Sequence, residues 1–160
     1  MGKEIERKFL LQGTLPPNSR KTNIRQGYLQ TDKERTVRIR TITMKNTTRG
    51  YLTIKGLGSI SGMSRYEFET EIPPEDATHL LTLCDQPLIE KVRYQITHAN
   101  NTWEIDIFLG VNQGLAVAEI ELEAEDQVFD KPDFIGAEIT GEIKYYNSML
   151  QKEPFTTWGK

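Results

Sequence analysis

Charged and apolar residues alternate with a period of two along most of this chain, and this pattern restricts its fold more than any other feature. In the segment RTVRIRT, Arg38 and Arg40 share one parity while Val37 and Ile39 take the other. A period of two is that of a β-strand, whose successive side chains point to opposite faces of a sheet. The pattern predicts eight strands, at residues 4–10, 24–30, 36–44, 50–55, 64–72, 89–97, 102–108 and 116–123.

Short connections rich in turn residues separate these predicted strands. KNTTR, HANN and GVNQG each contain asparagine or glycine, residues that tolerate tight turns. Such connections favour antiparallel hairpins, which either close into a barrel or stack as a sandwich. The glycine-rich GLGSISG lacks the GK[ST] ending of a nucleotide-binding P-loop, so we interpret it as a mobile hairpin.

Two stretches carry a helical period instead. Residues 73–84 begin with two prolines and repeat apolar residues at i, i+3, i+4 and i+7 from Ala77. Residues 141–152 place Tyr146 and Leu150 on one side. Both patterns predict helices that pack through one apolar face, so the expected class is mainly β with a few helices (α+β).

Composition limits the class of protein further. The 160 residues are 27% charged and 37% hydrophobic, which predicts one globular domain over residues 1–160. A net charge of −3 argues against general nucleic-acid binding, which needs a basic excess. No apolar run is long enough to span a membrane, and a single cysteine, Cys84, permits no disulfide within the chain. We therefore expect a cytoplasmic protein with neither a membrane nor a nucleic-acid partner.

Charges of one sign are grouped within individual strands. An ordinary solvated sheet face also alternates with a period of two, but it mixes signs and polar types. Here Glu-x-Glu, Arg-x-Arg and Lys-x-Arg pairs follow one another. Such neighbours lie about 7 Å apart, where a like pair costs about 0.6 kcal/mol in water and about 2.4 kcal/mol at an effective dielectric of 20. In an enclosed space they need compensation from other strands or from a ligand.

The charged residues that are predicted to share one face of the strands form a balanced set. Seven are bases and seven are acids: Lys8, Arg38, Arg40, Lys55, Arg65, Lys91 and Arg93, against Glu4, Glu6, Glu67, Glu69, Asp106, Glu119 and Glu121. Arginine and lysine bind phosphate oxygens, and carboxylates are the hard donors that Mg²⁺ or Mn²⁺ prefers. The set therefore predicts a site for a polyanion with its metal ions, and metal-assisted phosphoryl transfer to water. Glu71, Glu104 and Glu123 have the same parity but lie nearer strand ends, and we interpret them as solvated rim.

The N-terminal E-I-E-R-K resembles the ExExK signature of CYTH domains, also called triphosphate tunnel metalloenzymes. The resemblance continues in order through IRQGYL, RTVRIRT, LTIKG, SRYEFETEI, IEKVRY, WEIDIFLG, LAVAEIELE and PDFIGAEIT. It implies an eight-stranded antiparallel β-barrel closed as a tunnel, with a charged interior and a few covering helices. It also implies a small-molecule triphosphate substrate and a divalent cation.

The resemblance assigns roles to individual residues. Phosphate oxygens would contact Lys8, Arg38, Arg40, Lys55, Lys91 and Arg93. Metal would be held by Glu4, Glu6, Glu119 and Glu121, with Glu67 and Glu69 serving a second ion or its waters, and Asp106 orienting either a basic partner or a metal-bound water. Lys8 and Tyr28 are the candidate catalytic residues, with Tyr28 as a plain wall residue in the alternative. Arg65 pairs either with a glutamate or with phosphate.

Among the activities of this family, the compact length favours a hydrolase of inorganic tripolyphosphate, forming pyrophosphate and phosphate. Nucleoside triphosphates are possible additional substrates. The alternatives are a class IV adenylate cyclase, which needs a site for adenine and ribose, and a non-catalytic module that binds polyphosphate or nucleotide. The many paired acids favour an enzyme over a module, since anion binding alone needs only the bases.

Overall fold

The computed structural model describes residues 2–16, 19–32 and 34–159, and these residues form a mainly β structure. The strands are β1 (Gly2–Leu11), β2 (Arg20–Gln30), β3 (Arg35–Met44), β4 (Thr47–Gly58), β5 (Ser64–Ile72), β6 (Ile89–His98), β7 (Asn101–Phe108), β8 (Ala116–Glu121) and β9 (Ile135–Glu138). The helices are α1 (Pro74–Leu81) and α2 (Asn147–Lys152), with 3₁₀ turns at η1 (Gly110–Asn112), η2 (Ile143–Tyr145) and η3 (Phe155–Thr157).

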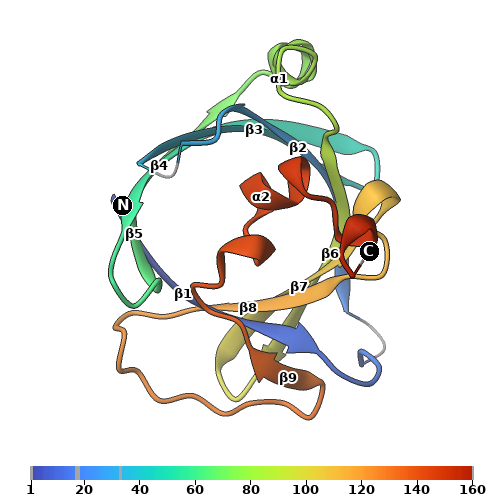
Figure 1. Cartoon of the computed structure of the whole chain (residues 1–160). Coiled ribbons are helices and arrows are strands. Elements are labelled where there is room, and N and C mark those ends of the chain that lie inside the picture. The colour runs from blue at the N-terminus through green and yellow to red at the C-terminus, as the bar shows by residue number, and fades with distance from the viewer. Residues whose placement is uncertain (1, 17–18, 33, 160) are drawn as a thin grey trace.

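The first eight strands close into an antiparallel barrel, seen along its axis in Figure 1. Over the described residues the strand order is β5-β4-β3-β2-β6-β7-β8-β1, and β1 also pairs with β5. The closing pairs join Gly2–Ile5 of β1 to Ser64–Glu67 of β5. The predicted eight-stranded closed barrel is thus confirmed, and the sandwich alternative is excluded.

The apolar parity of the strands points outward, where other segments cover it. α1 lies on one side of the barrel in Figure 1, and its Ala77 packs against Ile39 of β3. The long connection after β8 covers another side, where Phe129 meets the edges of Phe9 and Trp103. Because the exterior buries the hydrophobic side chains, the charged parity faces the interior.

The second predicted helix differs in both length and place. α2 covers Asn147–Lys152 and not the whole of 141–152, because Tyr146 takes an extended backbone with ψ 136°. In Figure 1 α2 lies within the ring of strands, not on its outside. Its Leu150 belongs to a buried cluster with Ile89 and Val117, residues that share the inward parity of the charged set. α2 therefore plugs the barrel where the lining turns apolar, so only the first of the two predicted helices covers the outside.

Strand ends differ from the sequence-based boundaries. β1, β2 and β4 are longer than predicted, while β8 ends at Glu121 instead of Glu123. The four-residue β9 was not predicted; it pairs with the last residues of β1. Backbone pairing continues through polar residues such as those at 20–23, where no apolar alternation marks a strand. Across the described ranges, no helix has the length and apolar character needed to cross a membrane.

Candidate active site

The barrel encloses a polar cavity of about 430 Å³. Among the described residues, its wall contains all of the predicted site residues except Asp106. Arg65 and Glu104 also line it, so Glu104, whose side chain is 40% exposed, is solvated as predicted but also contributes to the wall. Glu104 lies opposite Glu119 on the neighbouring strand, which keeps it on the inner face.

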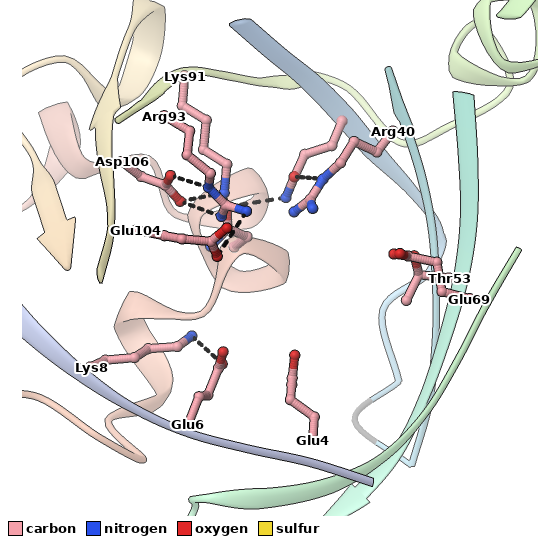
Figure 2. A network of polar contacts seen from close by, with 12 residues as sticks. Glu4, Glu6, Lys8, Arg40, Thr53, Glu69, Lys91, Arg93, Glu104 and Asp106 are labelled. Carbon is pink, nitrogen blue, oxygen red and sulfur yellow. Dashed lines mark hydrogen bonds and ion pairs between the residues drawn. The ribbon is translucent and has the colours of Figure 1, made fainter. Parts of the chain in front are cut away.

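Acids predominate on one side of this cavity and bases on the other, although Lys8 lies with the acids, and Glu104 and Asp106 lie beside Arg93 (Figure 2). Glu4, Glu6 and Lys8 project from β1 on one side, while Arg40 and Arg93 project from β3 and β6 on the other. β1 and β8 pair so that Glu6 faces Glu121 and Lys8 faces Glu119. The register of two strands thus gathers the acidic side from residues more than 110 positions apart in the chain.

The carboxylates of Glu6 and Glu119 lie close enough to share a proton. Burial raises the pKa of Glu6 well above its ordinary value, and the neighbouring Glu119 raises it further. Burial also opposes ionisation of Glu119, but the Lys8 ammonium, the hydrogen bond with Glu6 and the Arg93 charge together outweigh it and lower the pKa of Glu119 to about 2. Lys8 Nζ lies 3.8 Å from Glu6 Oε1. Of the two carboxylates Glu6 is therefore the easier to protonate, and a bound cation would relieve the repulsion between them.

A second acidic group surrounds Lys55. Its Nζ lies 2.9 Å from Glu4 Oε1 and 3.7 Å from Glu67 Oε2. Although burial works against it, the Lys55 ammonium holds the pKa of Glu4 below its ordinary value. Burial and the charge of Glu4 raise the pKa of Glu67. Lys55 therefore compensates one of these two carboxylates and leaves the other with excess negative charge.

The basic side is built on one buried carboxylate, Asp106. Arg93 donates two hydrogen bonds to it, at 2.7 and 2.9 Å, and Lys91 Nζ lies 2.7 Å from Asp106 Oδ2. Despite the opposing effect of burial, these two cations hold the pKa of Asp106 far below its usual range. Asp106 is not among the described residues that line the cavity, and its contacts are to Arg93 and Lys91. Glu104 Oε1 also lies 3.3 Å from Arg93 Nη1, so two carboxylates stand against the two cations of this group.

Arg38 and Arg40 extend the basic side along β3. Arg40 donates from Nε to Gln26 at 2.9 Å, and burial, with Arg38 and Arg93 nearby, lowers the pKa of Arg40. Arg38 donates to Thr53 at 3.1 Å and more weakly to Glu69 at 3.4 Å. The buried Arg38 Nε has no hydrogen-bond partner among the described residues. A buried donor without an acceptor is costly, and a bound anion would satisfy it.

Tyr28 and Arg65 complete the predicted set. The Tyr28 side chain is buried in the wall, and its hydroxyl accepts a hydrogen bond from Gln26 at 3.1 Å. Arg65 donates to the Gly56 carbonyl and the Thr36 hydroxyl. Among the described residues no carboxylate forms an ion pair with Arg65, so the predicted pairing with a glutamate is not what the geometry shows.

Comparison with known proteins assigns this chain to one family. The sequence profile described as CYTH domain matches residues 2–154. The chain belongs to the CYTH family. It is 48% identical, over 97% of both chains, to an inorganic triphosphatase of Acetivibrio thermocellus. It is 33% identical to an inorganic triphosphatase of Nitrosomonas europaea, over 92% of this chain and 95% of that one.

Solved structures show the same CYTH fold. The crystal structure of the inorganic triphosphatase NE1496 superposes with a TM-score of 0.65 at 28% identity, covering 92% of this chain and 96% of that one. The PH1819 protein of Pyrococcus horikoshii superposes with a TM-score of 0.56 at 20% identity, covering 78% and 80%. The comparison with PH1819 shows that this fold is also shared at low sequence identity.

Some residues of this CYTH cavity carry no charge pattern that a sequence reading could detect. Gln26 contacts Arg40 and Tyr28 beneath the wall, and α2 contributes Tyr146 and Asn147 to the lining. Gln26 does share the inward parity of β2 with Tyr28, which is the one available signal. Nothing in the residues 146–148 themselves indicates that this segment enters the barrel, because a helical period describes only its apolar face.

The acidic side of the CYTH cavity fits a hard divalent cation. No cluster of three His, Cys, Asp or Glu side chains within the described ranges forms a ready-made metal cage. Mg²⁺ does not require one, because it is usually bound through one or two carboxylates completed by water and substrate phosphates. The Glu6–Glu119 pair supplies two adjacent oxygen donors whose repulsion a cation would relieve. Neighbouring Glu4 and Glu121 supply further oxygens.

Proposed function

We propose that this protein hydrolyses inorganic tripolyphosphate to pyrophosphate and phosphate with the help of Mg²⁺ or Mn²⁺. The observation that carries the proposal is a single cavity whose wall combines a basic side and an acidic side. The triphosphatases of A. thermocellus and N. europaea, similar over nearly the full chain, support the same reaction class. A small-molecule triphosphate is therefore the proposed substrate.

The basic side would hold the phosphate chain. Arg38, Arg40 and Arg93 present guanidinium groups able to bind phosphate oxygens in pairs, and Lys91 and Lys55 add point charges. Asp106 would keep Arg93 and Lys91 in place through contacts of 2.7 to 2.9 Å. Holding the phosphate chain in a fixed position reduces the entropic part of the activation barrier for hydrolysis.

The acidic side would supply the hydrolytic half of the site. Glu4, Glu6, Glu119 and Glu121 would hold the cation, with Glu67 and Glu69 placed for a second ion or its waters. When bound, such an ion neutralises phosphate charge and orients the attacking water. Lys8, held between Glu6 and Glu119, would stabilise negative charge that develops on the transferred group. Tyr28, whose hydroxyl oxygen accepts from Gln26, is free to donate its proton to a phosphate oxygen.

A substrate panel tests the proposal directly. The purified protein, with Mg²⁺ or Mn²⁺, should release phosphate from tripolyphosphate faster than from ATP, GTP, thiamine triphosphate or pyrophosphate. Equal or faster turnover of ATP would remove the inorganic-substrate claim. Formation of cyclic AMP from ATP would instead identify a cyclase.

Variants separate an enzyme from a binding module. Glu121→Ala should reduce turnover at least about a hundredfold while tripolyphosphate binding survives in part, because the bases remain. Arg38→Ala should weaken binding of the anion itself, by about tenfold or more. A wild-type protein that binds tripolyphosphate without any turnover would establish the binding module.

A further inference from the structure

A neutral amide lies buried among the cations of the cavity wall. Gln26 is fully buried, and its Oε1 accepts a hydrogen bond from Arg40 Nε at 2.9 Å. Its Nε2 donates in the other direction, to Asn147 Oδ1 at 3.0 Å and to the Tyr28 hydroxyl at 3.1 Å. Gln26 therefore connects the arginine of β3 to the plug helix α2.

A second amide continues the chain of contacts. Asn147 Oδ1 accepts from Lys91 Nζ at 2.9 Å as well as from Gln26. The order Arg40–Gln26–Asn147–Lys91 runs from β3 through β2 and α2 to β6, and Figure 2 shows the two cations at its ends. The Gln26 oxygen accepts from Arg40, and the Asn147 oxygen accepts from Lys91. The hydrogen bond from Gln26 to Asn147 joins the two amides and fixes their orientation.

The chemistry of an amide explains why these positions are not acidic. Arg40 and Lys91 are like charges, each at most 8% exposed, and each needs hydrogen-bond acceptors to remain in a fixed place. A carboxylate acceptor would hold them but also cancel their charge, as Asp106 does in part for Lys91. An amide oxygen holds the side chain in place without adding a counter-charge of its own.

From these contacts we infer that Gln26 and Asn147 are positioning residues, forming a relay that holds Arg40 and Lys91 toward a bound anion. α2 is then part of anion recognition and not only a plug. The inference rests on the proposed function for the identity of the anion, inorganic tripolyphosphate. The two amides touch the cations and not the reacting atoms, so they act through Arg40 and Lys91.

Affinity measurements on single and double variants test the relay. Asn147→Leu and Gln26→Leu each replace the amide by a branched hydrocarbon and should weaken tripolyphosphate binding about tenfold, measured by calorimetry without metal. With metal, kcat should stay within about threefold of wild type while KM rises. The double variant should bind tripolyphosphate no more weakly than the single variant with the lower affinity, because both residues act in the same series of hydrogen bonds. Asn147→Ala serves if leucine at this position prevents folding.

Two comparisons separate positioning from general damage to α2. Gln151→Leu removes another buried amide of the same helix, whose Nε2 donates to the Gln86 carbonyl at 2.9 Å, and should lower the melting temperature without changing anion affinity. In a Lys91→Met background, Asn147→Leu should have little further effect on affinity. The relay is overturned if Gln151→Leu weakens binding equally, or if Asn147→Leu and Gln26→Leu multiply to about a hundredfold.

The same measurements distinguish this inference from the proposed function. Wild-type protein that binds tripolyphosphate but shows no turnover removes the proposed hydrolase, while the affinity comparisons still decide the relay. Wild-type protein that binds no tripolyphosphate overturns both. Turnover with unchanged affinity in both single variants overturns the relay alone.

Discussion

At the scale of single residues, the interior of this barrel contains charges that are stable only because of specific partners. Asp106 is 1% exposed, and Lys91 beside it is equally buried. Burial of an ion is costly, and a contact of 2.7 Å offsets that cost only while both partners remain. The effect of a substitution here depends on which charge it leaves behind.

Asp106→Asn should therefore be strongly destabilising. The change keeps the shape of the side chain but leaves Lys91 buried without a counter-charge and Arg93 with Glu104 alone, 3.3 Å away, at a cost of about 3–5 kcal/mol. Denaturant unfolding measures this free energy. Glu71→Gln is the control, because the Arg49–Glu71 pair is exposed and its loss should cost less than about 1 kcal/mol. Similar losses for the two variants would contradict the buried-network account.

Lys91 should take up a proton when the anion binds. Burial, together with Arg93 and Arg40, lowers the pKa of Lys91 to about 7 although Asp106 opposes the shift. At pH 8 its amine is then mostly neutral in the free protein, and a bound polyanion raises the pKa and draws in a proton. Calorimetry of tripolyphosphate binding without metal, in buffers of different ionisation enthalpy, measures that uptake. Lys91→Met should reduce it by up to one proton; equal uptake in both proteins would refute the assignment.

At the scale of elements, the position of α1 depends on close approach to β4. A Cβ atom added at Gly50 would lie 2.6 Å from the Ala77 Cβ of α1 and 3.0 Å from the Ile72 carbonyl oxygen. The first distance is shorter than real Cβ contacts and the second is tight, so α1 and β4 would have to move apart. A glycine in the middle of a strand ordinarily weakens it, and here the space it leaves is used by the helix.

Gly50→Ala should destabilise the protein by about 1–3 kcal/mol, the usual cost of overpacking. Gly56→Ala in the same strand is the matched control, because its added Cβ would meet the Tyr66 Cβ at an ordinary 3.5 Å. Alanine there should change stability by less than about 1 kcal/mol. Urea unfolding of both variants checks the difference, and equal stabilities would show that α1 is free to shift.

At the scale of the whole molecule, the cavity balances opposite charges across an open space. An anion alone binds beside the uncompensated acidic side, and a cation alone binds beside the basic side. Each ligand should therefore improve the site for the other, a positive coupling between them. The barrel makes this coupling possible, because it keeps the two sides at a fixed separation through its continuous hydrogen-bonded sheet.

The coupling should appear in thermal stability. Mn²⁺ with tripolyphosphate should raise the melting temperature by more than the sum of the shifts from either ligand alone, since ligands that bind the folded state stabilise it. Chelation of Mn²⁺ should remove most of the combined shift. Glu121→Gln should reduce the excess while leaving the shift from tripolyphosphate alone nearly intact. Additive shifts in the wild type would mean that the two sides do not communicate.

Local chemistry in the sequence determined the strands, their faces and the residues gathered inside. The period of two placed Arg38, Arg40 and Glu119 on one surface, because a strand alternates its side chains whatever it pairs with. α1 was likewise visible in its own apolar period. These features can be predicted without knowledge of any long-range contact.

Tertiary structure alone decided the closure of the barrel, the place of α2 and the partners of each charge. The sequence pattern did not separate a barrel from a sandwich, since both bury one face; the β1–β5 pairing settles that choice. α2 enters the barrel because the inward parity turns apolar at Ile89 and Val117, which is visible only once the strands are aligned. The Gln26–Asn147 contact joins residues 121 positions apart, and no local pattern encodes a contact between two neutral amides.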